Sequence, residues 1–250
     1  RHDSPLYSVG NLSNEKKEIL NKFIEFYKQD KYQELAVKDG FNALEDYKCE
    51  IENLDGNTIL QAQKLWKENK NGDKPIVAVF VADVSGSMEG EPLNELKKSL
   101  LNGSRYIGEE NSIGLVTYSN DVNINLPIEK FDLNQRSLFT GAVQDMDASG
   151  GTATFDAIAV AVQMLLDEKE KNPDAKLMLF VLSDGETNIG HSLDDLREIL
   201  ESVKIPVHTI GYNANIEALE NISRINEATS INADSDDVIY KLGSLFNAEM

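Results

Sequence analysis

The sequence predicts a doubly wound α/β fold, with a mostly parallel sheet and one antiparallel edge strand, preceded by a helical segment. Two continuous apolar runs, Ile76–Ala82 and Leu177–Leu182, are typical of strands that are covered on both faces. Helical patterns alternate with these and further strand patterns to the C-terminus, which favours a doubly wound sheet. A composition of 41% hydrophobic and 27% charged residues indicates a globular chain and argues against a disordered one.

Residues 1–74 carry helical patterns and no strongly apolar strand. Ser13 can cap a helix with apolar residues on one face from Ile19 to Tyr27, and Gly40 can end the helical pattern that follows. A third helix is predicted around Ile59–Trp66, and we expect the aromatic residues of these helices to be buried. The polar stretch Asn69–Pro75 predicts a linker, which divides the chain into a helical segment (1–74) and a second domain (75–250).

After the linker and the first apolar strand, Pro92 begins a helix that Gly103 ends. Ile113–Tyr118 is the next strand. Apolar and polar residues then alternate from Val122 to Ile128 around a proline, which predicts an antiparallel edge strand. The remaining elements are a buried helix at Phe155–Leu166, the strand Leu177–Leu182, a helix from Ser192, a strand at Val207–Ile210, a helix at Ile216–Ile225, a short strand near Ile231 and a last helix at Val238–Phe246.

Three polar loops stand beside the predicted buried elements. They are Asp83–Met88 after the first apolar strand, Ser149–Thr154 before the buried helix, and Ser183–Glu186 after the strand Leu177–Leu182. Ligands of such sheets bind outside the carboxyl ends of the strands. The loops supply hydroxyl and carboxylate oxygens without imidazole or thiolate, and these are the ligands that a hard cation prefers. Gly86 allows the tight turn that Asp83, Ser85 and Ser87 need in order to converge.

Taken together, the three loops resemble the metal-ion-dependent adhesion site of the von Willebrand factor A family, and the resemblance covers residues 76–246. It implies that Ser85, Ser87 and Thr152 coordinate a divalent ion directly, while Asp83 and Asp184 hold it largely through water. The loop spacing favours Thr152 but leaves Thr154 as an alternative. By the same resemblance, an acidic side chain of a protein partner completes the coordination, and the last helix shifts in some relatives.

The expected ion is Mg²⁺, with Mn²⁺ or Ca²⁺ as alternatives, because the donor set is rich in hydroxyls and Mg²⁺ keeps waters readily. We expect a non-catalytic adhesion module. Ser85 has no histidine nearby in sequence, and no Gly-Lys-Ser/Thr follows Gly150-Gly151, so a hydrolase triad and a phosphate loop have no support. Two other functions stay open: a helper subunit of an intracellular AAA+ ATPase, and a metal-assisted hydrolase or phosphotransferase with Asp83 as nucleophile.

The first fifty residues resemble the C-terminal end of a bacterial extracellular solute-binding protein. The resemblance is carried by Arg1–Tyr7, the helix from Ser13 and the stretch Tyr32–Asn42. It implies export to the outside or the surface of a bacterium, with a lipid anchor as one form of attachment. The sequence begins at Arg1 and not at Met, so we expect a processed or truncated chain.

The charge and the cysteine count exclude several classes of partner and site. With 24 basic and 43 acidic residues the formal charge is −19, which argues against nucleic acid as the main partner. The single cysteine, Cys49, excludes an internal disulfide and a thiolate metal cluster, and it leaves the cytoplasm open as a location. No run reaches the roughly 18 apolar residues of a membrane helix. Nothing in the sequence sets the oligomeric state.

Overall fold

A computed structural model describes residues 12–39, 54–70, 74–185, 187–212, 216–233 and 238–250, and these are the residues discussed below. The chain divides into two compact units, residues 1–63 and 64–250. The predicted boundary between residues 74 and 75 lies beyond this division, after the helix α3 (Gly56–Asn69). Cys49, Gly40 and the segment Arg1–Tyr7 lie outside the described residues.

The first unit contains α1 (Asn14–Tyr27) and α2 (Asp30–Lys38). Ser13 caps α1 as predicted, because its side chain accepts a hydrogen bond from the backbone N–H of Lys16. The expected burial of apolar residues is wrong for α1 and α2, since neither helix has a buried residue. Phe23, for example, is 51% exposed.

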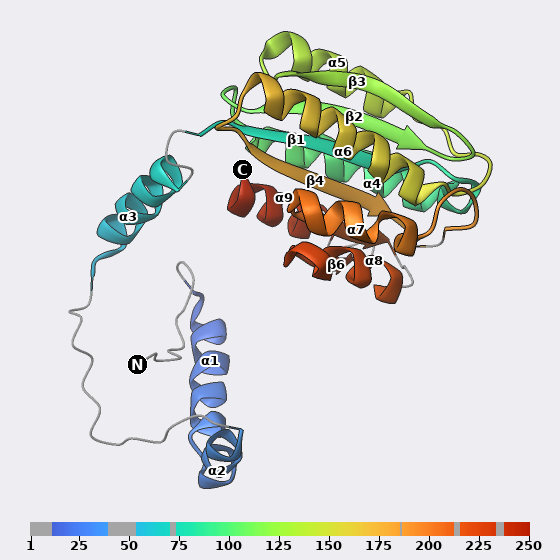
Figure 1. The fold of residues 1–250 in the computed structure, drawn as a ribbon. Coiled ribbons are helices and arrows are strands. Elements are labelled where there is room, and N and C mark those ends of the chain that lie inside the picture. The colour runs from blue at the N-terminus through green and yellow to red at the C-terminus, as the bar shows by residue number, and fades with distance from the viewer. Residues whose placement is uncertain (1–11, 40–53, 71–73, 186, 213–215, 234–237) are drawn as a thin grey trace. The chain divides into compact units, whose positions relative to one another are not determined.

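The second unit is built on one six-stranded sheet with the strand order β3-β2-β1-β4-β5-β6 (Figure 1). All neighbouring strands are parallel except β2 and β3, so the predicted doubly wound sheet with an antiparallel edge strand is confirmed. The strands are β1 (Ile76–Asp83), β2 (Ser112–Tyr118), β3 (Val122–Lys130), β4 (Lys176–Ser183), β5 (Val207–Tyr212) and β6 (Ser230–Ala233).

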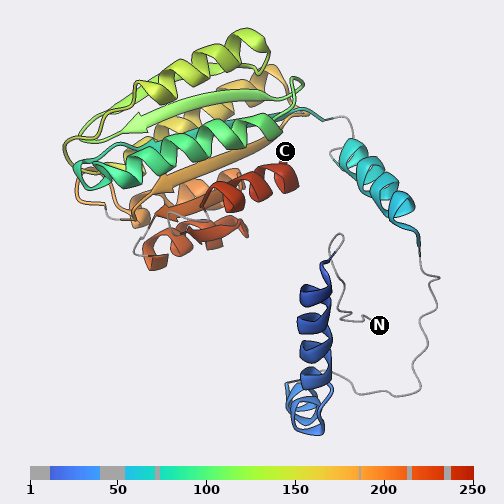
Figure 2. The ribbon, with the colours of Figure 1, turned by 180° about the vertical axis from the view of Figure 1, so that it is seen from behind.

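Helices cover both faces of the sheet, and Figures 1 and 2 show the two sides. One face carries α4 (Glu91–Gly103), α5 (Leu133–Gln144) and α9 (Val238–Glu249), and the other carries α6 (Thr154–Lys171), α7 (Leu193–Val203) and α8 (Ile216–Ser223). Short 3₁₀ turns lie at η1 (Gly86–Met88), η2 (Ser104–Tyr106) and η3 (Arg224–Asn226).

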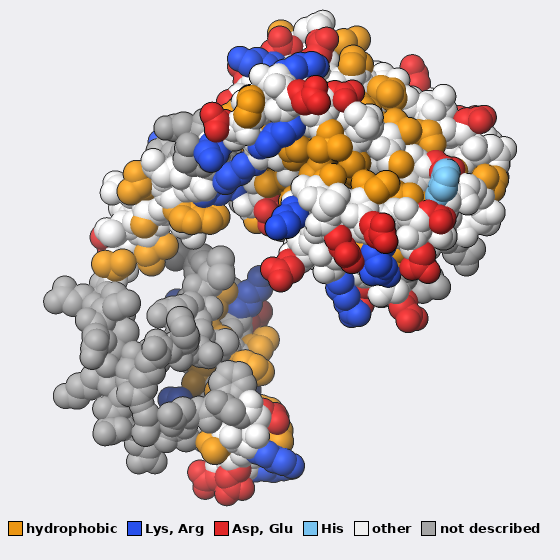
Figure 3. All heavy atoms as spheres, in the orientation of Figure 1, with side chains coloured by type: hydrophobic (Ala, Val, Ile, Leu, Met, Phe, Trp, Pro, Cys, Tyr) orange, Lys and Arg blue, Asp and Glu red, His pale blue; other side chains and the backbone are white. Residues whose placement is uncertain are grey.

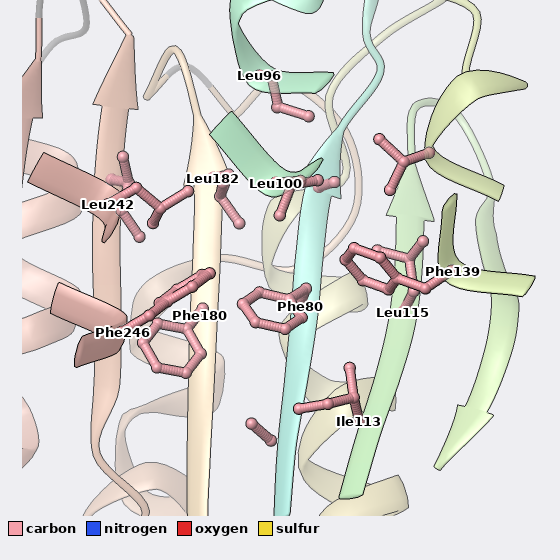
Figure 4. Packing of buried hydrophobic residues seen from close by; sticks show 14 of the residues in the cluster. Phe80, Leu96, Leu100, Ile113, Leu115, Phe139, Phe180, Leu182, Leu242 and Phe246 are labelled. Atoms are coloured by element: carbon pink, nitrogen blue, oxygen red, sulfur yellow. The ribbon is translucent and has the colours of Figure 1, made fainter. Parts of the chain in front are cut away.

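Every residue of β1 is buried, as the continuous apolar run predicted. Its side chains alternate between the two layers: Phe80 packs with the α4, α5 and α9 cluster, and Val79 packs on the α6, α7 and α8 side. Phe80 lies against Phe180 and Phe246, with ring centroids 5.2 and 5.0 Å apart (Figure 4). This packing, together with the register of β1 against β2 and β4, sets the position of the polar residues at the end of β1.

The sequence did not predict α5. Its residues Phe139 and Val143 are buried, but Leu133 and Leu138 are 78% and 50% exposed. The apolar residues of α5 therefore do not all lie on its buried face, and the helical periodicity is weak. Asp132 caps the helix by accepting a hydrogen bond from the backbone N–H of Gln135, a signal that could have located it. None of the helices in the described part of the chain is long and apolar enough to cross a membrane.

Candidate metal site

The candidate site lies at the carboxyl ends of two neighbouring central strands, β1 and β4. β1 lies between β2 and β4, and it is parallel to both. Asp83 is the last residue of β1, and Ser183 is the last residue of β4. The carboxyl ends of these two strands therefore meet at the point where the strand order reverses, which is the usual ligand position in this class of sheet.

Asp83 is fully buried, and both of its carboxylate oxygens accept hydrogen bonds. Oδ1 accepts from the backbone N–H of Ser85 at 2.8 Å. Oδ2 accepts from the hydroxyl of Ser183 at 2.7 Å and from the Tyr118 hydroxyl at 3.2 Å. The carboxylate is thus oriented by groups from β2, from β4 and from its own loop, and its position is set before any ligand arrives.

The surroundings of Asp83 disfavour its negative charge. Burial raises the pKa of Asp83, and the nearby charge of Asp184 adds to the rise, while hydrogen bonds from Ser85 and Ser183 oppose it. Burial likewise raises the pKa of Tyr118, so this hydroxyl stays protonated and donates to the carboxylate. A bound cation would offset the unfavourable burial of the two acidic groups.

The first loop brings two hydroxyls together. Ser85 is buried and Ser87 is exposed, and their Oγ atoms lie 3.0 Å apart. Gly86 begins η1 between them, and its backbone N–H donates to the carbonyl oxygen of Gly150 at 2.9 Å. A Cβ atom at Gly86 would stand 3.2 Å from that oxygen, so glycine allows the first loop to approach the second.

The second loop places two buried threonines beside the start of α6. Thr152 is 3% exposed and Thr154 is 2% exposed. Thr154 is the first residue of α6, and its hydroxyl is buried without a hydrogen-bond partner among the described residues. The turn before Thr152 needs Gly150, whose φ of +79° lies in the left-handed region.

Asp184 completes the predicted set, directly after β4. Its Oδ1 atom is buried and has no hydrogen-bond partner in the part of the chain that the structure describes. An unpaired buried carboxylate oxygen is costly unless a cation or water satisfies it, so this atom fits a metal site. Among the described residues no three acidic, histidine or cysteine side chains cluster as ligands, and the donor set is mainly hydroxyl oxygens.

The comparisons with known proteins identify the family to which this fold belongs. A family model described as the von Willebrand factor type A domain matches residues 78–246. The chain belongs to the von Willebrand factor type A domain family. Inter-alpha-trypsin inhibitor heavy chain H3 from Bos taurus is 30% identical over 179 residues, which cover 65% of this chain and 20% of that protein.

Two solved structures share the fold of this von Willebrand factor A domain. The pilus adhesin SpaC from Lactobacillus rhamnosus GG, in an open conformation, has a TM-score of 0.61 at 18% identity and covers 70% of this chain and 30% of its own. The manganese-loaded TRAP protein of Plasmodium vivax has a TM-score of 0.56 at 16% identity, with 70% and 74% covered. The family resemblance stated from the sequence is confirmed, while the ligand set and the solute-binding resemblance stay predictions.

Two residues that support the domain's site were not predicted. Tyr118 was predicted only as the end of a strand, and Ser183 only as the first residue of the third polar loop, but both donate hydrogen bonds to Asp83. The signal in the sequence is a polar group at the last position of a buried strand, next to a loop with oxygen ligands. A buried polar side chain at this position costs free energy unless a buried hydrogen-bond partner satisfies it.

The histidines of the domain have other roles. His208 lies in β5 and is 4% exposed, with its ring 5.1 Å from that of Phe180, so it is a packed core residue. Burial lowers its pKa. His191 is exposed and pairs with the carboxylate of Asp156, which raises the pKa of this histidine.

Proposed function

We propose that this von Willebrand factor A domain is a non-catalytic protein-binding module that depends on a divalent metal. The observation that carries the proposal is the buried Oδ1 atom of Asp184, which has no hydrogen-bond partner among the described residues. It follows β4, and the close hydroxyls of Ser85 and Ser87 follow the neighbouring parallel strand β1. In the proposed site Ser85, Ser87 and Thr152 are direct ligands. Asp83 and Asp184 act largely through water.

Mg²⁺ is the proposed ion, with Mn²⁺ or Ca²⁺ as alternatives. A bound ion would supply an electrophilic position for an acidic side chain of a protein partner, because neutral hydroxyls leave most of its charge uncompensated. The chain's own residues supply the rest: Tyr118, Ser183 and the Ser85 amide orient Asp83, and the close contact of Gly86 with Gly150 joins two of the loops.

The names of the relatives support adhesion as the class of function. SpaC is described as a pilus adhesin, and the TRAP structure as manganese-loaded. We propose binding of a protein partner at the surface of a bacterium or outside it, as the solute-binding resemblance of the first residues also implies. The alternative of a helper to an intracellular AAA+ ATPase uses the same site, and the location of the protein in the cell separates the two.

An enzyme that uses Asp83 as nucleophile has less support. Both oxygens of Asp83 already accept hydrogen bonds, and its side chain is fully buried, so an attack on a substrate would break these bonds first. Turnover of p-nitrophenyl phosphate by the wild type, lost in Asp83→Asn, would favour this alternative over the binding module.

Calorimetric titration of the full chain with MgCl₂ tests the proposal. We expect the wild type to bind one ion, and Ser87→Ala and Asp83→Ala to bind it at least about tenfold more weakly, because each loses a group of the site. Ser87 is exposed, so its variant keeps the packing intact. Glu89→Ala is the matched control on the same loop and should bind like the wild type. Equal binding by the wild type and both site variants would overturn the assigned ligands.

A further inference from the structure

The loop from Ser149 to Ala153 is held by backbone hydrogen bonds at every residue. Each bond goes to a different neighbour, and the partners come from three separate parts of the chain. The bonds are Ser149 N to Val84 O (2.9 Å), Gly86 N to Gly150 O (2.9 Å), Gly151 N to Asn120 Oδ1 (2.7 Å), Thr152 N to Asn188 Oδ1 (2.9 Å) and Ala153 N to Ser119 O (3.0 Å). A loop held in this way has one conformation set by its surroundings.

Thr152 is hydrogen-bonded on both sides by the loop that follows β4. Its backbone N–H donates to the side-chain oxygen of Asn188, and its carbonyl oxygen accepts from the backbone N–H groups of Asn188 at 3.1 Å and of Ile189 at 3.4 Å. None of these bonds uses the Thr152 hydroxyl, so the hydroxyl is left for a ligand. Asn188 therefore fixes the position of the Thr152 backbone and does not occupy the Thr152 hydroxyl.

Asn188 also joins two predicted ligand loops, because it lies on the loop that begins with Asp184. Because Gly151 has no side chain, the Oδ1 atoms of Asn188 and Asn120 can approach its backbone closely. A Cβ atom at Gly151 would stand 2.9 Å from Asn188 Oδ1 and 3.0 Å from Asn120 Oδ1. The two amide side chains thus accept hydrogen bonds from the backbone N–H groups of Gly151 and Thr152, and they come from two different loops. We define this set of contacts as the asparagine clamp.

We infer that Asn188 is a positioning residue whose side chain, with that of Asn120, makes the site selective for Mg²⁺ over Ca²⁺. This inference rests on the proposed metal site. Mg²⁺ needs near-ideal octahedral geometry at short distances, whereas Ca²⁺ accepts longer and more variable ones. A Thr152 whose backbone is held in place presents its hydroxyl at a defined position, which suits the smaller ion, whereas a Thr152 released from the clamp still serves the larger one.

Two measurements on the full chain test the clamp. In metal-free protein, hydrogen exchange followed by NMR should show the Thr152 amide exchanging about tenfold faster in Asn188→Ala, because its acceptor is gone. Asn188→Asp keeps an acceptor oxygen and should restore the protection. In calorimetry, Asn188→Ala should bind Mg²⁺ about tenfold more weakly, as the loss of a group that orients a ligand usually does, and Ca²⁺ within about threefold of the wild type.

Thr187→Ala is the matched control, because Thr187 is exposed on the same loop and lies outside the clamp. It should match the wild type in both measurements. Asn120→Ala gives a second test, with faster exchange expected at Gly151 instead of Thr152. Unchanged exchange at Thr152 in Asn188→Ala overturns the clamp, and equal losses for both ions overturn the selectivity. A wild type that binds neither ion refutes the proposed function, while the exchange result still decides whether the clamp exists.

Discussion

The hydroxyl groups of Thr152 and Thr154 differ in their surroundings. The backbone of Thr152 is held by Asn188, which leaves its hydroxyl for a ligand. The hydroxyl of Thr154 is buried near the Tyr118 hydroxyl but makes no hydrogen bond of normal geometry among the described residues, which costs free energy wherever no ligand satisfies it. Substitution by valine removes each hydroxyl and preserves the shape of the side chain, so the two positions can be compared directly.

We predict that Thr152→Val lowers the affinity for Mg²⁺ at least about tenfold, while Thr154→Val leaves it unchanged. Thr154→Val should keep the free energy of unfolding or raise it by up to about 1 kcal/mol, because it removes an unsatisfied buried group. Calorimetry and urea unfolding in EDTA measure the two quantities. A loss of affinity in Thr154→Val alone would assign the ligand to Thr154.

At the same scale, the sequence points to candidate ligands more readily than to the groups that support them. Asp83, Ser85 and Asp184 could be chosen because oxygen-bearing residues directly follow buried apolar strands. Asn188 and Tyr118 could not, since their bonds to the site depend on how distant loops meet in three dimensions. Local pattern carries no information about such contacts.

Among the elements, α4 and α9 approach closely because of a glycine. A Cβ atom at Gly103 would lie 2.7 Å from two ring carbons of Phe246. This ring is 1% exposed and packs against both Phe80 and Phe180, with its centroid 5.0 Å from each of theirs, so it has little room to move. In α5, by contrast, a Cβ atom at Gly141 would meet nothing within 4 Å.

We predict opposite effects for the same substitution in these two helices. Gly103→Ala should lower the free energy of unfolding by about 1–3 kcal/mol, because the added methyl group overpacks the core. Gly141→Ala should raise it by about 0.5–1 kcal/mol, because alanine is the better helix former where space is available. Urea unfolding of the full chain checks both. A stabilised Gly103→Ala would show that Phe246 can shift at no cost.

Element positions follow from the sequence where burial is strong and fail where it is weak. The all-buried strand β1 and the edge strand β3 were predicted from apolar continuity and from alternation. The helix α5 was missed because exposed Leu133 and Leu138 blur its apolar face. The expected core around α1 and α2 was wrong because an amphipathic pattern shows that a face can be buried, and not that it is.

For the whole molecule, the negative charge is concentrated in the second domain. Residues 1–74 hold 12 basic and 14 acidic residues, so 12 − 14 = −2, and residues 75–250 hold 12 and 29, so 12 − 29 = −17. Only Asp83 and Asp184 of these 29 belong to the proposed site. Figure 3 shows acidic side chains spread over the visible face, so most of the excess is solvated surface. A carboxylate partner would therefore meet a net unfavourable field, which a bound cation would offset locally.

This surplus predicts that salt stabilises the protein. In EDTA, raising NaCl from 10 to 300 mM should screen the self-repulsion and raise Tm by about 2–4 °C, which corresponds to about 1 kcal/mol for a domain of this size. MgCl₂ at the same ionic strength, without EDTA, should raise Tm further, because a ligand that binds only the folded state stabilises it by mass action. The further rise should be smaller in Ser87→Ala, whereas the NaCl effect should remain. A Tm that does not rise with NaCl would contradict the self-repulsion, and an equal effect of both salts at matched ionic strength would contradict a specific metal site.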